Sequence, residues 1–412
     1  MNGEKLIERK DEMAKWMVDE ITHIIKTFGK RDAGSKGEEE ASHYMAKVLR
    51  EQCGCEDVKV ESFKENPGAF YGWMYLTLTC ALLAIAFFFY RPLISIILII
   101  IGLFISIMEF GLYKKFVDPL FKEKTGHNVT AIRPCTGEVK QRIFFNGHSD
   151  AAWEWPVNYR LGGVAYEAHS VIGFAGAFYY LFLSIVFIVR NGINASPLSD
   201  PEILLWGKWG LIFAPFIFGL YWMWNSKRVV DGANDNLSGC EMGIAVLKAM
   251  EDEGINLEHT EVGVIITGSE EVGLRGAKAW AEAHKGEYED VPTIIYAFDT
   301  IHDPKQLMVN YRDLNSTVKA DKEAADLFYE SAKEARVPIK KGLVPPLGGS
   351  TDGSGFAQGG FRAVGITGLD HKLENYYHTR RDTYDNLDEE GLACCYAATV
   401  KTLENFDNGI NR

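Results

Sequence analysis

Four stretches of the sequence carry no charged side chain and are too apolar for the surface of a water-soluble protein. They span residues 73–90, 93–108, 171–189 and 209–224. A helix that crosses a bilayer needs roughly 20 mainly apolar residues, and these stretches approach that length once the aromatic residues at their ends are counted. Buried core helices are the alternative, but four uncharged runs exceed what an amphipathic helix needs. The sequence therefore predicts an integral membrane protein with four spans, in two helical hairpins that contact the lipid bilayer.

The basic residues that flank the spans predict their orientation. Two hairpins leave all of the hydrophilic chain on one side of the membrane. Eight basic residues flank the spans on that side and three on the other: Lys64, Lys114, Lys115, Lys122, Lys124, Arg160, Lys227 and Arg228 against Arg91, Arg190 and Lys208. By the positive-inside rule, the soluble part and both termini face the cytoplasm. The first 29 residues are typical of a charged amphipathic helix and contain no export signal.

The chain outside the hairpins alternates between strand and helix patterns. The domain predicted from it comprises residues 1–68, 114–160 and 225–412, interrupted by hairpins at 69–113 and 171–224. The predicted strands cover 56–63, 128–134, 141–150, 261–268 and 292–299, and the predicted helices cover 237–254, 323–336 and 388–406. Such alternation favours a three-layer α/β domain with a mixed, mainly parallel central sheet.

Composition excludes two classes of protein. The net charge of −13 argues against a nucleic-acid partner, because nucleic-acid binding depends on basic groups that neutralise phosphates. Seven cysteines without a Cys-x-x-Cys pair argue against a disulfide framework and fit a reducing compartment. The sequence gives no prediction for the oligomeric state.

Several predicted strands end in possible metal ligands. The candidates are His148 and Asp150 in "FFNGHSD", Asp235 in "DGANDNLSG", Glu270 and Glu271 in "TGSEE", Asp299 in "YAFD" and His378 in "YYHTRRDT". Each has an ordinary alternative: a strand-end histidine is often structural, an aspartate before a helix is often a cap, and adjacent glutamates are often solvated. Together, imidazole and carboxylate groups without thiolates indicate zinc or a similar divalent ion.

These elements resemble a known family. The motifs His-x-Asp, Gly-Ala-x-Asp-Asn-x-Ser-Gly, Glu-Glu, Asp and His-Thr-x-x-Asp-Thr follow one another in the order found in the di-zinc exopeptidases. That family includes leucyl-type aminopeptidases, glutamate carboxypeptidase-like enzymes and glutaminyl cyclases. The resemblance begins at "GKRDAGSKGEEEASHYMAKVL" and, outside the hairpins, runs nearly to the end of the chain. Two membrane hairpins are a departure from it.

The resemblance implies a division of roles among the candidates. One Zn²⁺ ion would be held by His148 and Asp299, and the second by Glu271 and His378. Asp235 would bridge the two ions, and the peptide bond from Asp235 to Asn236 would be cis. Asp150 would orient His148, Glu270 would act as the general base towards metal-activated water, and Tyr377 would donate to the oxyanion. Asp352 takes the acidic position of the substrate pocket, although Gly353 stands where the family has a bulky residue.

Four functions follow as hypotheses. The first is a zinc aminopeptidase that acts on the N-termini of peptide substrates. A carboxypeptidase would need an arginine for the substrate carboxylate: Arg275, Arg312, Arg362, Arg380 or Arg381. A single-zinc glutaminyl cyclase would keep several of the same ligands, but Asn236, Ser238-Gly239 and Asp382-Thr383 favour the peptidases. The fourth is a catalytically silent membrane receptor or scaffold.

Overall fold

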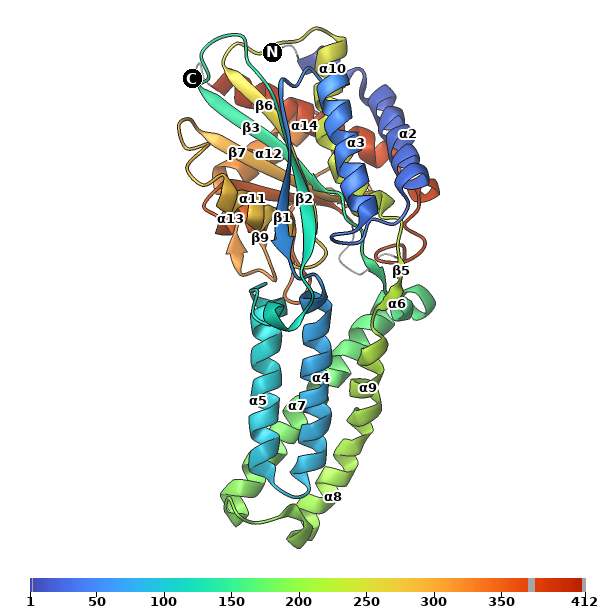
Figure 1. Cartoon of the computed structure of the whole chain (residues 1–412), viewed down its shortest axis with the longest axis vertical. Coiled ribbons are helices and arrows are strands. Elements are labelled where there is room, and N and C mark those ends of the chain that lie inside the picture. The colour runs from blue at the N-terminus through green and yellow to red at the C-terminus, as the bar shows by residue number, and fades with distance from the viewer. Residues whose placement is uncertain (2, 370–374, 410–412) are drawn as a thin grey trace. The chain divides into compact units, whose positions relative to one another are not determined.

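The computed structural model describes residues 1, 3–369 and 375–409, which form two compact units. Unit 1 comprises Met1–Glu65, Glu123–Trp153 and Arg228–Arg412, and unit 2 comprises Asn66–Lys122 and Glu154–Lys227. The chain leaves unit 1 twice and returns twice, as Figure 1 shows by its colours. Unit 2 is therefore made of two insertions into the sequence of unit 1.

Unit 1 is built on an eight-stranded mixed sheet with the order β1-β2-β6-β3-β7-β12-β8-β11. The strands are β1 (Asp57–Glu65), β2 (Lys124–Arg133), β3 (Gln141–His148), β6 (Thr260–Thr267), β7 (Thr293–Ile301), β8 (Met308–Asn310), β11 (Lys340–Gly342) and β12 (Arg362–Gly368). The four central strands β6, β3, β7 and β12 are parallel, and β1 and β2 are antiparallel to their neighbours. β8 is antiparallel to β12 and parallel to β11. The predicted mixed, mainly parallel sheet is thus confirmed.

Helices cover both faces of the sheet and make three layers (Figure 1). One face is covered by α2 (Lys10–Phe28), α3 (Lys36–Gln52), α10 (Ser238–Asp252), α12 (Lys322–Glu334) and α14 (Glu389–Gly409), and the other by α11 (Arg275–Ala283) and α13 (Asp352–Gln358). Successive strand residues point to opposite faces. Phe145 accordingly packs in the larger core with Tyr296, and Phe144 packs against Trp280 on the other face.

The remaining elements of unit 1 are short. They are α1 (Gly3–Ile7), the β9 (Arg312–Asp313) and β10 (Val318–Lys319) pair, the π-helical turn η6 (Ala233–Leu237) and the 3-10 turn η7 (Tyr384–Asn386). The chain passes between the units in β4 (Trp153–Glu154) and in β5 (Asn225–Val229). All predicted strands and helices of the α/β part are present, with ends that differ by a few residues. The short helix α13 was not among the predicted helices.

Unit 2 contains four helices that are long and apolar enough to cross a membrane: Gly68–Phe88, Pro92–Gly111, Gly163–Asn191 and Pro201–Trp222. The first is α4, the second is α5 (Pro92–Ser106) extended by η1 (Ile107–Gly111), and the third is α7. The short helix η3 (Pro197–Ser199) connects α7 to the fourth helix, whereas η2 (Asp118–Leu120) follows the second helix and α6 (Pro156–Leu161) precedes α7. A separate apolar core, which includes Phe88, Tyr180 and Phe187, holds the four helices together.

Two of these helices begin eight residues before the predicted uncharged runs. The third begins at Gly163 and not at residue 171, so it includes the polar residues Glu167 and His169. Glu167 is exposed, and Nε2 of His169 lies 2.9 Å from the carbonyl oxygen of Phe216. The fourth begins at Pro201 and not at residue 209. Its start is fixed by the side chain of Asp200, which accepts a hydrogen bond from the Ile203 N–H at 3.2 Å.

The uncharged run suggested one continuous fourth helix, but the structure shows an interrupted one. It consists of α8 (Pro201–Gly210), η4 (Leu211–Phe213), α9 (Ala214–Gly219) and η5 (Leu220–Trp222). Pro215 removes one helical N–H donor within this stretch. The hydroxyl groups of Tyr179 and Tyr180 on α7 donate to the carbonyl oxygens of Trp206 and Gly207, each at 2.8 Å. Side chains of α7 thus bind backbone carbonyl groups just before the irregular part of the fourth helix.

Candidate metal centre

The carboxyl ends of three parallel central strands meet at one edge of the sheet of unit 1. His148 is the last residue of β3, Asp299 lies near the end of β7, and Glu270 and Glu271 follow shortly after β6. Ligands in open α/β sheets bind at such strand ends. The fold therefore brings together side chains that are more than 100 residues apart in the sequence.

Asp235 lies between two histidines. Its Oδ1 is 3.3 Å from Nε2 of His148, and its Oδ2 is 3.0 Å from Nε2 of His378. The peptide bond from Asp235 to Asn236 is cis, as expected from the resemblance. One carboxylate thus presents a separate oxygen to each imidazole, which is the arrangement that a carboxylate shared by two cations would need.

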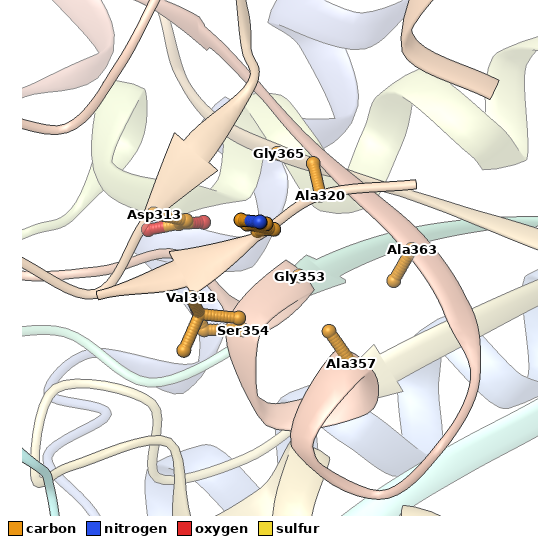
Figure 2. A pocket seen from close by; sticks show the side chains of 9 residues that line it. Asp313, Val318, Ala320, Gly353, Ser354, Ala357, Ala363 and Gly365 are labelled. Carbon is orange, nitrogen blue, oxygen red and sulfur yellow. The ribbon is translucent and has the colours of Figure 1, made fainter. Parts of the chain in front are cut away.

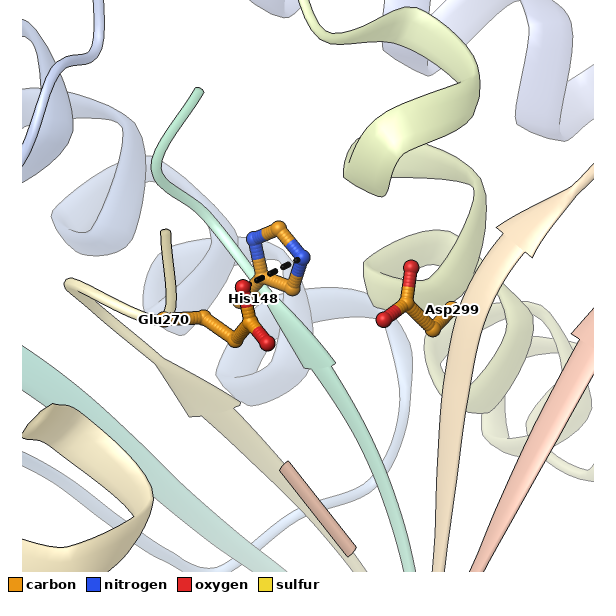
Figure 3. A group of neighbouring side chains, drawn as sticks. All are labelled: His148, Glu270 and Asp299. Carbon is orange, nitrogen blue, oxygen red and sulfur yellow. Dashed lines mark ion pairs between the residues drawn. The ribbon is translucent and has the colours of Figure 1, made fainter. Parts of the chain in front are cut away.

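Six ligand-type side chains form two groups of three. His148, Glu270 and Asp299 make one group, and Asp235, Glu271 and His378 make the other, with the ligand atoms of each group within 4.8 Å of one another. Figure 3 shows the first group, in which Oε2 of Glu270 lies 3.7 Å from Nε2 of His148. In the second group, Oε2 of Glu271 lies 3.2 Å from Nε2 of His378. Glu270, which was predicted as the general base, thus lies among the possible ligands of the first group.

The site holds more negative charge than it can balance by itself. Its two groups contain four carboxylates and two imidazoles, and His148, Asp235 and Glu271 are buried. In the part of the chain that the structure describes, the buried Oε1 of Glu271 and Nε2 of His148 make no hydrogen bond. A buried imidazole nitrogen and a buried carboxylate oxygen that make no hydrogen bond fit a divalent cation of the zinc type.

The protonation equilibria reflect the same crowding. Burial raises the pKa of Glu270 well above its usual value, and that of Asp299, with Asp235 beside it, to about 8. Burial alone would lower the pKa of His378, but the carboxylates of Glu271 and Asp235 raise this pKa to about 10. Bound cations act in the opposite direction, because positive charge favours ionised carboxylates and neutral imidazoles.

Asp150 contacts both the histidine and the glutamate turn. Its Oδ1 lies 3.4 Å from Nδ1 of His148, consistent with the predicted orienting role. Its two oxygens also accept the backbone N–H groups of Glu270 at 2.9 Å and Glu271 at 3.1 Å. This second contact was not predicted, because it depends on how the turn after β6 folds back towards β3.

Tyr377 and Asp352 lie near the two groups. The ring of Tyr377 stacks on that of His378, with centroids 4.1 Å apart. Burial and the carboxylates of Asp235 and Glu271 raise the pKa of the Tyr377 phenol well above its usual value. Asp352 begins α13, is buried and accepts a short hydrogen bond from Oγ1 of Thr267. A role of Asp352 in a substrate pocket stays a prediction.

Two residues have positioning roles that were not predicted from the sequence. Asp382 accepts the backbone N–H of Asn234 at 2.8 Å and that of Asp235 at 3.1 Å, so it holds the loop that carries Asp235. Arg31 is buried and donates to the carbonyl oxygens of Ser149 at 2.9 Å and Asp231 at 2.7 Å. A signal for Asp382 existed, because it belongs to the His-Thr-x-x-Asp-Thr motif.

A small pocket lies beside α13 (Figure 2). It is lined by Asp313, Val318, Lys319, Ala320, Gly353, Ser354, Ala357, Ala363 and Gly365. None of these lining residues belongs to the two ligand groups, so this pocket is separate from the metal centre.

Comparison with protein families decides the relationship. Residues 224–403 match the model of Peptidase family M28. The chain carries a peptidase family M28 domain. The matched segment includes Asp235, Glu270, Glu271, Asp299 and His378, whereas His148 lies before it. The resemblance found in the sequence is thereby confirmed.

Solved structures show the same fold at low sequence identity. BSAP, a zinc aminopeptidase from Bacillus subtilis, has a TM-score of 0.55 and 12% identity, over 95% of this chain and 94% of that one. An aminopeptidase from Aneurinibacillus sp. strain AM-1 has a TM-score of 0.56 and 14% identity, over 98% and 95%. A glutaminyl cyclase from Porphyromonas gingivalis has a TM-score of 0.51 and 11% identity, over 97% and 98%. No curated protein sequence matches the chain. The M28 domain thus shares its fold with zinc aminopeptidases and with cyclases.

Proposed function

We propose that the protein is a membrane-embedded zinc aminopeptidase with its catalytic domain in the cytoplasm. The observation that carries this proposal is the placement of Asp235, whose two oxygens each face one histidine at 3.3 and 3.0 Å. His148 and Asp299 would hold one zinc ion, and Glu271 and His378 would hold the other, with Asp235 shared between them. Bound zinc would supply Lewis-acid chemistry, polarising the scissile carbonyl group and making water acidic enough to react at neutral pH.

Glu270 is the proposed general base. Its carboxylate lies 3.7 Å from Nε2 of His148, and Asp150 fixes its backbone N–H. Peptide hydrolysis forms a bond from the water oxygen to the carbonyl carbon and breaks the bond to the amide nitrogen. Glu270 would take the proton of the attacking water and deliver it to the leaving amine. The Tyr377 hydroxyl would donate a hydrogen bond to the carbonyl oxygen as negative charge develops there.

The surroundings of two of the five candidate arginines favour an aminopeptidase over a carboxypeptidase. Arg362 forms ion pairs with Asp321 at 2.8 Å and with Glu323 at 2.8 Å. Arg312 donates to the carbonyl oxygen of Ser316 at 3.3 Å. These two guanidinium groups are already engaged, whereas the carboxylates of the site suit the free amino group of a peptide substrate.

Four apolar helices support the membrane part of the proposal, and the distribution of flanking basic residues supports the orientation. The mode of hydrolysis is tested by incubating the purified protein with free, N-blocked and C-blocked peptides and analysing the products by mass spectrometry. An aminopeptidase removes N-terminal residues from free and C-blocked peptides and leaves N-blocked peptides intact. Loss of C-terminal residues, or of ammonia from an N-terminal glutamine, would replace the proposal by the carboxypeptidase or the cyclase.

A further inference from the structure

Two buried carboxyl groups lie behind the turn that carries Glu270 and Glu271. Glu38 belongs to α3 and Glu65 ends β1, and both are almost fully buried, with 0% and 2% of their surface exposed. Both contact the hydroxyl of Ser269, the residue immediately before Glu270. Oγ of Ser269 lies 2.7 Å from Oε1 of Glu65 and 3.3 Å from Oε1 of Glu38.

The Ser269 hydroxyl has fewer protons than its two contacts with carboxyl groups need. A serine hydroxyl has one proton to donate, and here it faces two carboxyl oxygens. Both contacts are hydrogen bonds only if one glutamate carries a proton itself. The second oxygen of Glu38 already accepts the backbone N–H of Gly34 at 2.7 Å.

The charged groups around the pair favour retention of that proton. Burial and the carboxylate of Asp150 raise the pKa of Glu38 well above its usual value. Burial raises the pKa of Glu65 to about 7, although Arg275 and Lys124 act in the opposite direction. Two ionised glutamates at this depth would repel one another and Asp150.

The contact holds the backbone of the Glu270–Glu271 turn together with Asp150. Ser269 has a left-handed backbone conformation with φ 59°, which non-glycine residues seldom adopt. Glu38 packs directly on the turn, since a Cβ atom at Gly268 would lie 2.3 Å from its Oε1. Asp150 holds the N–H groups of Glu270 and Glu271. The direction of both glutamate side chains therefore depends on Asp150 and on the Ser269 hydroxyl.

We propose that Glu38 and Glu65 share one proton and act through Ser269 as positioning residues for the Glu270–Glu271 turn. The kinetic part of this inference rests on the proposed peptidase function. When the shared proton is lost at alkaline pH, Ser269 can satisfy only one of two mutually repelling carboxylates. The turn then loses one of its two anchors, and turnover falls while the metal stays bound.

The first test does not need activity. Infrared difference spectra of the holoprotein at neutral pH compare the wild type with the Glu38→Gln/Glu65→Gln double variant and with Glu40→Gln, an exposed carboxylate on the same helix. The inference predicts that the double variant lacks one protonated-carboxyl absorption that Glu40→Gln retains. An unchanged absorption in the double variant would overturn the shared proton, whether or not the protein is a peptidase.

The second test measures kcat, KM and bound metal as functions of pH. Ser269→Ala is expected to lower kcat roughly tenfold or more, with KM and metal content close to those of the wild type. Each single Glu→Gln variant keeps a hydrogen-bonding group and a single negative charge, so it should retain more activity than Ser269→Ala and lose the alkaline fall of kcat. Wild-type kcat in Ser269→Ala, or the wild-type alkaline limb in both Gln variants, would overturn the positioning role. If Ser269→Ala does not fold, the isosteric Gln variants alone decide the question.

Discussion

Glu270 and Glu271 are neighbours in the chain, but their side chains belong to different ligand groups. Glu270 lies with His148 and Asp299, and Glu271 lies with Asp235 and His378. Adjacent side chains at the end of a strand diverge, so one turn can supply both groups. The backbone N–H groups of both residues bind the single carboxylate of Asp150, which fixes that divergence.

The two glutamates are therefore expected to respond differently to amidation. Glu270→Gln should lower turnover on the order of 10²-fold or more, because the proton acceptor is lost, and should leave the metal bound. Glu271→Gln should lower both metal content and turnover, with partial recovery in excess zinc, because a neutral oxygen replaces an anionic ligand. Metal analysis beside steady-state kinetics separates the two. If Glu270→Gln loses metal and Glu271→Gln retains it, the two roles are reversed.

Asp382 belongs to neither ligand group, but its carboxylate accepts the backbone N–H of the ligand residue Asp235. In Asp382→Asn, an amide group replaces one of the oxygens that accept the N–H groups of Asn234 and Asp235. We expect a loss of about 1–3 kcal/mol in the free energy of unfolding, because a buried N–H loses its acceptor, together with weaker metal retention. Asp385→Asn, an exposed change one turn away, is the control. Equal metal retention in the two variants would contradict the positioning role.

At the scale of elements, His284 links the end of α11 to β1. Its Nε2 lies 2.9 Å from Oε2 of Glu61 on β1, and its Nδ1 makes a short contact with Glu287. Burial alone would lower the pKa of His284, but hydrogen bonds to Glu61 and Glu287 raise this pKa above its usual value. The charged imidazole thus stabilises the contact between strand and helix.

The raised pKa of His284 predicts how the stability of the fold changes with pH. A raised pKa in the folded state means that the contribution to stability is complete below the unfolded value of about 6.5. It disappears as the pH rises through the folded value. His284→Gln should therefore lower Tm more at pH 6 than at pH 9, as thermal denaturation in detergent would show, whereas His43→Gln, an exposed change, should lower it at neither pH. An equal loss at both pH values would show that the charge of His284 is unimportant.

The elements also show how far the sequence could predict the molecule. Strands such as β6 and helices such as α10 were predictable, because their apolar patterns are long and end in clear turn residues. The break at Leu211–Phe213 was not predictable, since the carbonyl groups of Trp206 and Gly207 just before it are bound by Tyr179 and Tyr180 from another helix. At the site, the motifs identified every member of the two ligand groups. The contacts of Glu38, Glu65 and Ser269 were missed because they join three distant segments.

At the scale of the whole molecule, the two insertions place four helices that are long and apolar enough to cross a membrane inside the sequence of the α/β unit. Cysteines introduced near Lys122 or after Asn405 should be shielded from impermeant thiol reagents in intact cells, and one in the loop at 191–199 should be labelled. This expectation follows from the uneven distribution of basic residues beside the spans. Labelling of the sites near Lys122 or Asn405 from outside would contradict the cytoplasmic orientation.

The central claim is that one carboxylate, Asp235, is shared by two metal ions. The most direct measurement is the zinc content of the purified protein per chain, determined by elemental analysis for the wild type, for Asp235→Ala and His378→Ala, and for Glu40→Gln as the control. The account predicts close to two ions in the wild type and in Glu40→Gln, and clearly fewer in Asp235→Ala and in His378→Ala, whose side chains face each other at 3.0 Å. A wild-type content near one ion would contradict the shared carboxylate and favour a single-zinc cyclase.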